Sequence, residues 1–157
     1  MSERARILVV DDDESIRKTL ATILEEEGYV VDTAKDGREA IGKSETNFYN
    51  LALVDIRLPD MEGTKLLTEM KETTPKMVKL IVTGYPSLEN AVEAVNKAAD
   101  GYLLKPLNMD VLLATIRKHL RKQEEAKRYD EGRFAEFVEA RAKEWEEEQT
   151  VAYKKPR

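Results

Sequence analysis

The sequence has no cysteine, a single histidine and no long apolar run, and each absence removes a class of function. Without cysteine the chain forms no disulfide, no thiolate zinc site and no cysteine nucleophile. The lone histidine, His119, argues against a histidine-based metal site or catalytic triad. The first apolar run has only about six residues, too few for a signal peptide or a membrane span. We therefore expect a cytoplasmic protein with no membrane partner.

The charge is modestly negative and unevenly spread. The net charge is −5, and 36% of the residues are charged. Residues 1–120 contain 16 basic and 21 acidic residues, whereas residues 121–157 contain 10 of each. This balance argues against a general binder of nucleic acids or anionic membranes. A chain of 157 residues has room for one domain and a modest appendage. We expect a domain over residues 1–120 and a charged tail over 121–157.

Short apolar runs alternate with segments of helical spacing. The runs that predict buried strands are Ala5–Val10, Val30–Ala34, Leu51–Val54, Lys79–Val82 and Gly101–Leu104. Such runs are too apolar to have one solvated face, and a helix after each provides the crossover that parallel strands need. The sequence therefore predicts an α/β domain of the (βα)5 type, with helices covering both faces of a parallel sheet.

The helical segments are defined by apolar residues that share one face. These residues are Ile16, Leu20, Ile23 and Leu24 in the first helix, Leu66, Leu67 and Met70 in the third, Leu88, Ala91, Val92 and Val95 in the fourth, and Val111, Leu112, Ile116 and Leu120 in the last. A weaker second helix is expected over Gly37–Ser44. Gly28 is placed to end the first helix.

The tail has a pattern of its own. Residues 121–128 contain almost no apolar side chains and are expected to extend the last helix into solvent. Beyond them, an amphipathic stripe is formed by Phe134, Phe137, Val138, Arg141 and Trp145. Gly132 marks a position where the helix could break or bend. The stripe favours a dimerisation element, but it spans barely three turns, and isolated helices this short are marginal. A signalling helix toward another domain is the other interpretation of the tail.

The chemically active side chains follow the predicted strands. Asp11 and Asp12 come after the first strand, Asp55 after the third, Thr83 after the fourth and Lys105 after the fifth. In an open parallel sheet, ligands bind beyond the carboxyl ends of the strands, near the point where the strand order reverses. We therefore expect three carboxylates, a hydroxyl and an ammonium group to converge at one edge.

This set of groups suits phosphoryl transfer. Crowded carboxylates need a neutralising cation, and oxygen ligands without nitrogen or sulfur favour a hard ion such as Mg²⁺ or Mn²⁺. A carboxylate can attack phosphorus and form an acyl phosphate. The transferred group then needs positive charge and hydrogen-bond donors around its oxygens, which the cation, Lys105 and Thr83 would supply.

Each residue also has an ordinary structural role when taken alone. The run of aspartates could cap the first helix, and Asp13 is the best candidate for a pure cap. Asp55 and Thr83 could be turn residues, and Lys105 a solvated surface lysine. Together, however, these readings require four coincidences at the same edge of one sheet. The combined pattern therefore favours a functional site.

Four segments resemble the receiver domains of two-component response regulators. The run Ile7–Arg17 is similar to the opening of these domains. The run Leu53–Gly63, LVDIRLPDMEG, resembles the family's phosphoacceptor motif, Asp-x-x-Leu/Met-Pro-x-Met-x-Gly. Val82–Gly84 and Gly101–Pro106 complete the likeness, which covers roughly residues 5–120.

The resemblance implies a flavodoxin-like doubly wound sheet of order 2-1-3-4-5, with a phosphoacceptor and a metal site. Asp55 would be the phosphoacceptor, and Asp11 and Asp12 the acidic pair. Asp12, Asp55 and the backbone carbonyl of Arg57 would hold Mg²⁺, with Asp11 beside them. The chain would then be a phosphorylated switch and not an enzyme acting on other molecules.

The resemblance also implies roles for residues around the phosphoryl group. Thr83 and Lys105 would bind it, and Thr83 would act with Tyr102 as the switch pair. The peptide bond from Lys105 to Pro106 would be cis. Arg57 and Tyr85 occupy the positions that flank the approach of water in this family. Because both are large, slow self-hydrolysis of the acyl phosphate is expected.

The implied partner is a sensor histidine kinase or a phosphotransfer protein. A self-dimer through the fourth helix, fifth strand and fifth helix, or through the tail, stays open. No DNA-binding output domain is evident, because the tail is too short and not basic enough. One alternative is a receiver module of a larger hybrid kinase or multidomain protein. A remote alternative is an aspartate-nucleophile phosphatase of the haloacid dehalogenase type, in which a second aspartate would stand at the position of Arg57.

Overall fold

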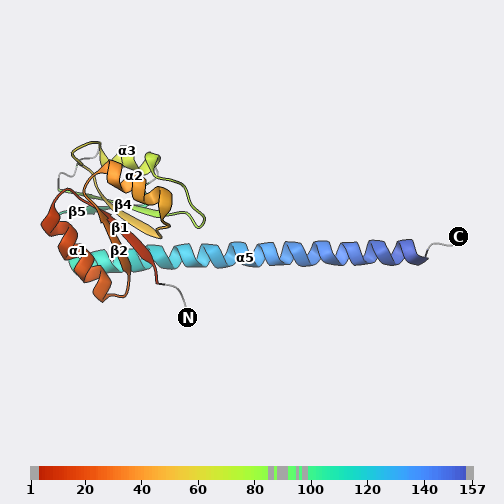
Figure 1. Ribbon diagram of the computed structural model, residues 1–157. Coiled ribbons are helices and arrows are strands. Elements are labelled where there is room, and N and C mark those ends of the chain that lie inside the picture. Colours follow the sequence, from red (N-terminus) through yellow and green to blue (C-terminus); the bar gives the residue numbers. More distant parts are fainter. Residues whose placement is uncertain (1–3, 85–86, 88–91, 95, 97–98, 155–157) are drawn as a thin grey trace. The chain divides into compact units, whose positions relative to one another are not determined.

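The structure, a computed structural model, describes residues 4–84, 87, 92–94, 96 and 99–154 (Figure 1). The chain forms two compact units, Met1–Arg121 and Lys122–Arg157. The expected fourth helix falls largely outside the described residues. Each unit is described by itself.

The first unit is built on a parallel sheet of five strands. The strands are β1 (Arg6–Val10), β2 (Val30–Ala34), β3 (Leu51–Asp55), β4 (Val78–Thr83) and β5 (Gly101–Leu104). Their order is β2-β1-β3-β4-β5, and every neighbouring pair is parallel. The predicted fold class and strand order are confirmed. Because β1 lies between β2 and β3, the strand order reverses there, and the carboxyl ends of β1 and β3 open at that point.

Helices cover both faces of the sheet. The described helices are α1 (Glu14–Glu26), α2 (Gly37–Thr46), α3 (Gly63–Glu69) and α5 (Met109–Lys154). Figure 1 shows α1 and the first turns of α5 on one face and α2 and α3 on the other. Side chains of successive strand residues point to opposite faces. Ile7 and Val9 thus enter the core against α1 and α5, and Leu8 and Val10 enter the core against α2 and α3. This two-sided burial explains the continuous apolar runs.

The ends of α1 agree with the sequence signals. Asp13 caps the helix, and its side chain accepts a hydrogen bond from the backbone amide of Ile16 at 3.1 Å. Gly28 follows the helix with a φ of 96°, a conformation that glycine adopts without steric cost. The cap expected at Asp13 and the helix end expected at Gly28 are both confirmed.

The third helix is shorter than its apolar spacing suggests. α3 ends at Glu69, and Met70 has an extended backbone with φ −71° and ψ 142°. Met70 is nevertheless buried at 3% exposure. The apolar spacing therefore indicated burial correctly but not backbone conformation. At the other end, the Gly63 amide donates to the Ile56 carbonyl at 2.7 Å, and a Cβ at Gly63 would overlap the Asp55 carbonyl oxygen. Glycine thus lets the loop after β3 pack closely against the strand end.

The tail helix continues through Gly132, where the sequence had left a break open. A single glycine in a helix interior costs only about 1 kcal/mol relative to alanine, so its neighbours can carry the helix across it. The second unit is accordingly one uninterrupted helix within the described residues.

Candidate functional site

Three carboxylates meet at the ends of β1 and β3. Asp11 follows β1 and is 4% exposed, whereas the next residue, Asp12, is exposed. Asp55 is the last residue of β3 and is 9% exposed. Carboxylate oxygens of Asp11, Asp12 and Asp55 all lie within 4.8 Å of one another. The expected convergence of these side chains is therefore present.

Lys105 joins the two buried carboxylates. Its Nζ lies 3.0 Å from Asp11 Oδ2 and 3.0 Å from Asp55 Oδ2. Burial is the largest single influence and lowers the pKa of Lys105. The hydrogen bonds and charges of Asp55 and Asp11 together outweigh it, so the pKa lies above its usual value. The ammonium therefore stays charged at neutral pH.

The backbone around Lys105 is fixed on both sides. Its amide donates to the Thr83 carbonyl at 2.7 Å, which ties the end of β5 to the end of β4. The peptide bond between Lys105 and Pro106 is cis, as predicted.

Backbone contacts fix the remaining oxygens of both buried carboxylates. Asp11 Oδ1 accepts a hydrogen bond from the Asp13 amide at 2.9 Å. Asp55 Oδ1 accepts one from the Arg57 amide at 3.1 Å. In addition, Arg17 donates to the Asp11 carbonyl at 2.7 Å. Each buried carboxylate is thus held by a backbone amide on one oxygen and by Lys105 on the other.

The charge balance of this cluster fits a hard divalent cation. Three carboxylates face one ammonium group, so ionised carboxylates leave an excess of negative charge that a divalent ion would compensate. The donors are all oxygen, which suits Mg²⁺ or Mn²⁺. Arg57 comes two residues after Asp55, and an antiparallel backbone bridge to Glu62 holds its backbone beside the cluster. The donor set is therefore compatible with the expected metal.

The remaining expected site residues lie on β4 and β5 or outside the described region. Thr83 ends β4 and is fully buried. Tyr102 lies on β5, is partly buried and packs against the core under α2 and α3. Tyr85 lies outside the described residues. The role expected for Arg57 and Tyr85 in slowing hydrolysis therefore stays a prediction.

The hydroxyl of Tyr102 is buried and has no hydrogen-bond partner among the described residues. A buried unpaired hydroxyl costs its desolvation energy. We expect Tyr102→Phe to leave the free energy of unfolding unchanged or to raise it by up to about 1 kcal/mol. Urea denaturation of the unphosphorylated protein measures this difference. A decrease of more than about 1 kcal/mol would show that the hydroxyl is bonded in solution.

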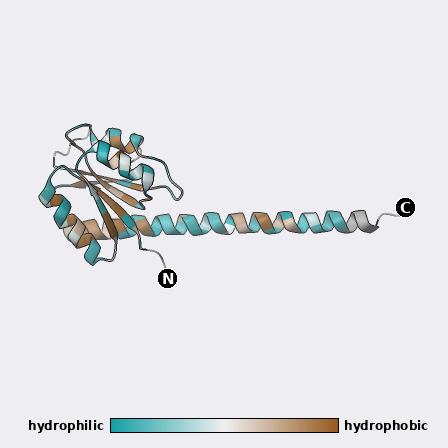
Figure 2. Ribbon diagram, in the orientation of Figure 1, coloured by the Kyte–Doolittle hydropathy of each residue, from teal (hydrophilic) through white to brown (hydrophobic). Residues whose placement is uncertain are grey.

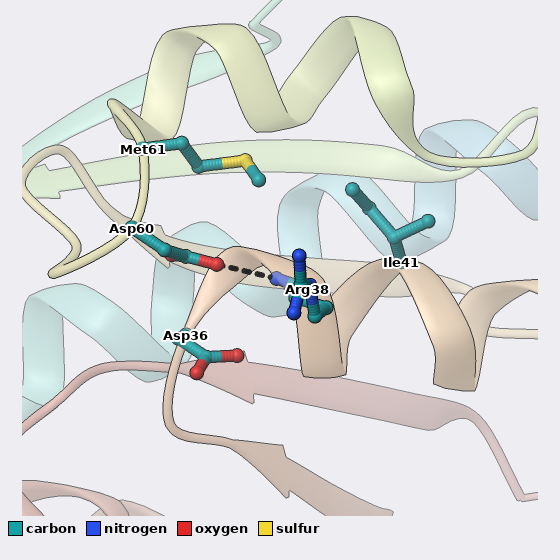
Figure 3. Close-up of a pocket in the computed structure, with 5 residues that line it drawn as sticks. All are labelled: Asp36, Arg38, Ile41, Asp60 and Met61. Atoms are coloured by element: carbon teal, nitrogen blue, oxygen red, sulfur yellow. Dashed lines mark hydrogen bonds between the residues drawn. The ribbon is translucent and has the colours of Figure 1, made fainter.

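A pocket away from the carboxylate cluster lies between the start of α2 and the loop after β3, and it has a structural role. It has a volume of about 410 Å³ and is lined by Asp36, Arg38, Ile41, Asp60 and Met61 (Figure 3). Asp60 accepts hydrogen bonds from the backbone amides of Gly37 and Arg38, both at 2.9 Å. The Gly37 hydrogen bond is the main reason that the pKa of Asp60 lies below its usual value. Sequence reasoning gave Asp60 no role because its partners are distant in the chain.

An apolar groove lies beside the carboxylate cluster, between α1 and the segment after β5. Its volume is about 580 Å³. It is lined by Ser15, Ile16, Thr19, Leu20, Lys105, Pro106, Leu107 and Met109. Lys105 therefore belongs both to the groove and to the cluster, so a protein seated in the groove would stand next to Asp55.

Comparison with known proteins gives consistent matches. A family model described as response regulator receiver domain matches residues 7–117. The transcriptional regulatory protein ZraR of Escherichia coli strain K12 is 43% identical over 114 residues, which are 73% of this chain and 26% of that protein. The match thus spans about a quarter of the length of this curated relative.

Among the described residues, no helix combines the length and the apolar composition that crossing a membrane requires.

Solved structures that resemble this chain are also receiver domains or response regulators, in agreement with the family model. A CheY-like receiver domain protein from Methanospirillum hungatei JF-1 is 48% identical, with a TM-score of 0.76, covering 79% of this chain and 99% of that one. A response regulator from Burkholderia pseudomallei, solved with a phosphorylated aspartic acid, a calcium ion and citrate, is 31% identical with a TM-score of 0.66, covering 78% of this chain and 72% of that one. With the strand order and the cluster at the strand ends, these matches show that the chain belongs to the receiver domains of two-component response regulators.

Proposed function

We propose that this chain accepts a phosphoryl group on Asp55 from a phosphohistidine of a sensor kinase or phosphotransfer protein. The observation that carries the proposal is the position of Lys105, whose Nζ lies 3.0 Å from both Asp55 Oδ2 and Asp11 Oδ2 at the strand ends. The phosphorylated aspartic acid and the calcium ion in the similar Burkholderia structure support it.

In this proposal, a carboxylate oxygen of Asp55 attacks phosphorus, the bond from phosphorus to the donor nitrogen breaks, and that nitrogen leaves with its electron pair. Lys105 and the Thr83 hydroxyl then contact the transferred oxygens. Asp12, Asp55 and the Arg57 carbonyl would hold Mg²⁺ or Mn²⁺, with Asp11 beside them. The bound ion would neutralise charge on the phosphoryl oxygens.

The proposed consequence is a change at β5. The new group adds charge and strong acceptor oxygens, which favour a hydrogen bond from the Thr83 hydroxyl. Movement of Thr83 toward the group would free space for the ring of Tyr102. The partly buried position of Tyr102 and its unpaired hydroxyl support two alternative placements of this ring.

We further propose that the phosphoryl donor docks in the groove between α1 and the segment after β5. The groove is largely apolar, and it ends at Lys105 beside the acceptor. Exposed apolar surface of this kind commonly marks an interaction site. A donor seated there would approach Asp55 from outside the carboxyl ends of the strands.

The last part of the proposal concerns where the chain works and how its two parts are used. We infer that the chain works in the cytoplasm and is a switch, with residues 121–157 as a helical tail after the receiver domain of residues 1–120. Membership of the receiver family argues against the phosphatase alternative. As the alternative we propose that the receiver serves a larger protein, and the match to only a quarter of the length of ZraR supports it.

The proposal predicts divalent-ion-dependent phosphorylation by a small donor. Incubation with acetyl phosphate and Mg²⁺ should add the mass of one phosphoryl group, and hydroxylamine should remove it, because acyl phosphates react with this nucleophile. Intact-protein mass spectrometry measures both steps. A label that forms equally well in excess chelator, or that resists hydroxylamine, would contradict an aspartyl phosphate at this site.

A further inference from the structure

The tail unit exposes large apolar side chains along one helix. Figure 2 shows it as hydrophilic apart from a hydrophobic band. Phe134, Phe137, Val138 and Trp145 are 68%, 61%, 48% and 62% exposed. With a rotation of about 100° per residue, these side chains and Arg141 fall within an arc of about 100°. A contiguous apolar face of this kind favours burial against a partner.

The spacing within this face is that of a coiled-coil seam. Phe134, Val138, Arg141 and Trp145 follow one another at steps of four, three and four residues. Alternating steps of three and four keep side chains on the line along which two helices touch. The face is therefore suited to another helix and is narrower than the surface a globular domain would need.

The charges on the same seam decide which way a second copy can lie. Continuing the steps outward reaches Glu131 and Lys127 on one side and Glu148 on the other. In a parallel, in-register pair each residue meets its own copy. Lys127, Glu131, Arg141 and Glu148 would then form four like-charge contacts, which are unfavourable.

We propose that two copies of this chain pair through their tails as antiparallel helices centred on Val138. In this register Val138 meets Val138 of the second copy. Phe134 faces Arg141 of the second copy, which allows a cation–π contact, and Lys127 faces Glu148 of the second copy. Twofold symmetry makes each of the last two contacts occur twice. The seam then contains no like-charge pair.

The charges also fix the register. A shift by one heptad in either direction places Arg141 against Arg141 or against Lys127 of the second copy. In the register centred on Val138, Phe137 meets Phe137 beside the seam. Asp130 and Glu144 of the second copy do approach at the edge, where solvent and salt screen their repulsion. The antiparallel register centred on Val138 therefore best combines apolar burial with charge complementarity.

Charge reversal with rescue tests this pairing. The full chain should self-associate in sedimentation equilibrium. Lys127→Glu and Glu148→Lys should each weaken association by about tenfold, because each reversal turns two opposite-charge pairs into like-charge pairs in every dimer. The double variant should recover the affinity of the parent. A monomer at all concentrations, or weakening in both single variants without recovery in the double, overturns the proposal.

Lys143→Glu is the matched control, because Lys143 is also flanked by glutamates, Glu139 and Glu147, but lies on the opposite side of the helix. It should associate like the parent, and a loss as large as that of Lys127→Glu overturns the pairing. This readout needs neither metal nor phosphorylation, so it fails or succeeds independently of the proposed function.

Disulfide trapping tests the orientation, since the chain has no native cysteine. Phe134→Cys mixed with Arg141→Cys should form a covalent dimer on mild oxidation. Each variant alone should not, because its two cysteines lie about 10 Å apart along an antiparallel pair. Rapid crosslinking of either variant alone would indicate parallel helices and overturn the proposal.

Discussion

Asp55→Asn should abolish acetyl phosphate labelling while the domain stays folded. In the parent, Lys105 Nζ donates a hydrogen bond to Asp55 Oδ2 at 3.0 Å. Asparagine has nearly the same shape as aspartate, and its amide oxygen can still accept this hydrogen bond. An amide, however, does not displace the leaving group from phosphorus as a carboxylate does. We expect at least a 100-fold loss of label, about 2.7 kcal/mol when expressed as a free energy. Intact mass and far-UV circular dichroism measure label and fold.

Asp60→Asn is the matched control for this experiment. Asp60 lies in the loop that follows β3, and its carboxylate accepts hydrogen bonds from α2 instead of joining the cluster. Loss of the Asp60 carboxylate should lower the free energy of unfolding without removing the acetyl phosphate label. If Asp55→Asn becomes labelled to the parent's level at another residue, Asp55 is not the acceptor.

The strands could be predicted closely from sequence because burial on both faces leaves a plain signal. The observed strands differ from the predicted ones by at most one residue at each end, as in β1, which starts at Arg6 and not at Ala5. The helices gave a weaker signal, since apolar spacing reports which side chains are buried and not where the backbone stops being helical. Met70 shows this, being buried but extended.

The sequence was enough to predict which residues come together at the site, but not the contacts that their side chains make. Parallel strands bring their carboxyl ends to one edge, so Asp11, Asp55 and Lys105 were expected together. The bridge from Lys105 to both aspartates depends on side-chain placement across three strands, which no local pattern encodes. The contrast between buried Asp11 and exposed Asp12 likewise follows from how the chain turns after β1.

Asp12→Ala should weaken Mg²⁺ binding and, unlike most substitutions at a folded site, stabilise the metal-free protein. Oxygens of Asp12, Asp11 and Asp55 lie within 4.8 Å of one another, so their negative charges repel when no cation is bound. Because Asp12 is exposed, solvent screens this repulsion, and we expect a gain of about 0.5 kcal/mol or slightly more. Loss of a carboxylate ligand should lower Mg²⁺ affinity at least about tenfold, which is about 1.4 kcal/mol.

Asp13→Ala separates this effect from helix capping. Asp13 is the adjacent aspartate and the cap of α1, with Oδ1 3.1 Å from the Ile16 amide. Its removal should destabilise the metal-free protein by about 1 kcal/mol and leave the Mg²⁺ affinity unchanged. Thermal unfolding with and without Mg²⁺ measures both quantities, because an ion that binds only the folded state raises the melting temperature by mass action. The two neighbouring aspartates should therefore shift metal-free stability in opposite directions. If Asp12→Ala lowers it as Asp13→Ala does, Asp12 supports the helix, and the proposed metal site loses a ligand.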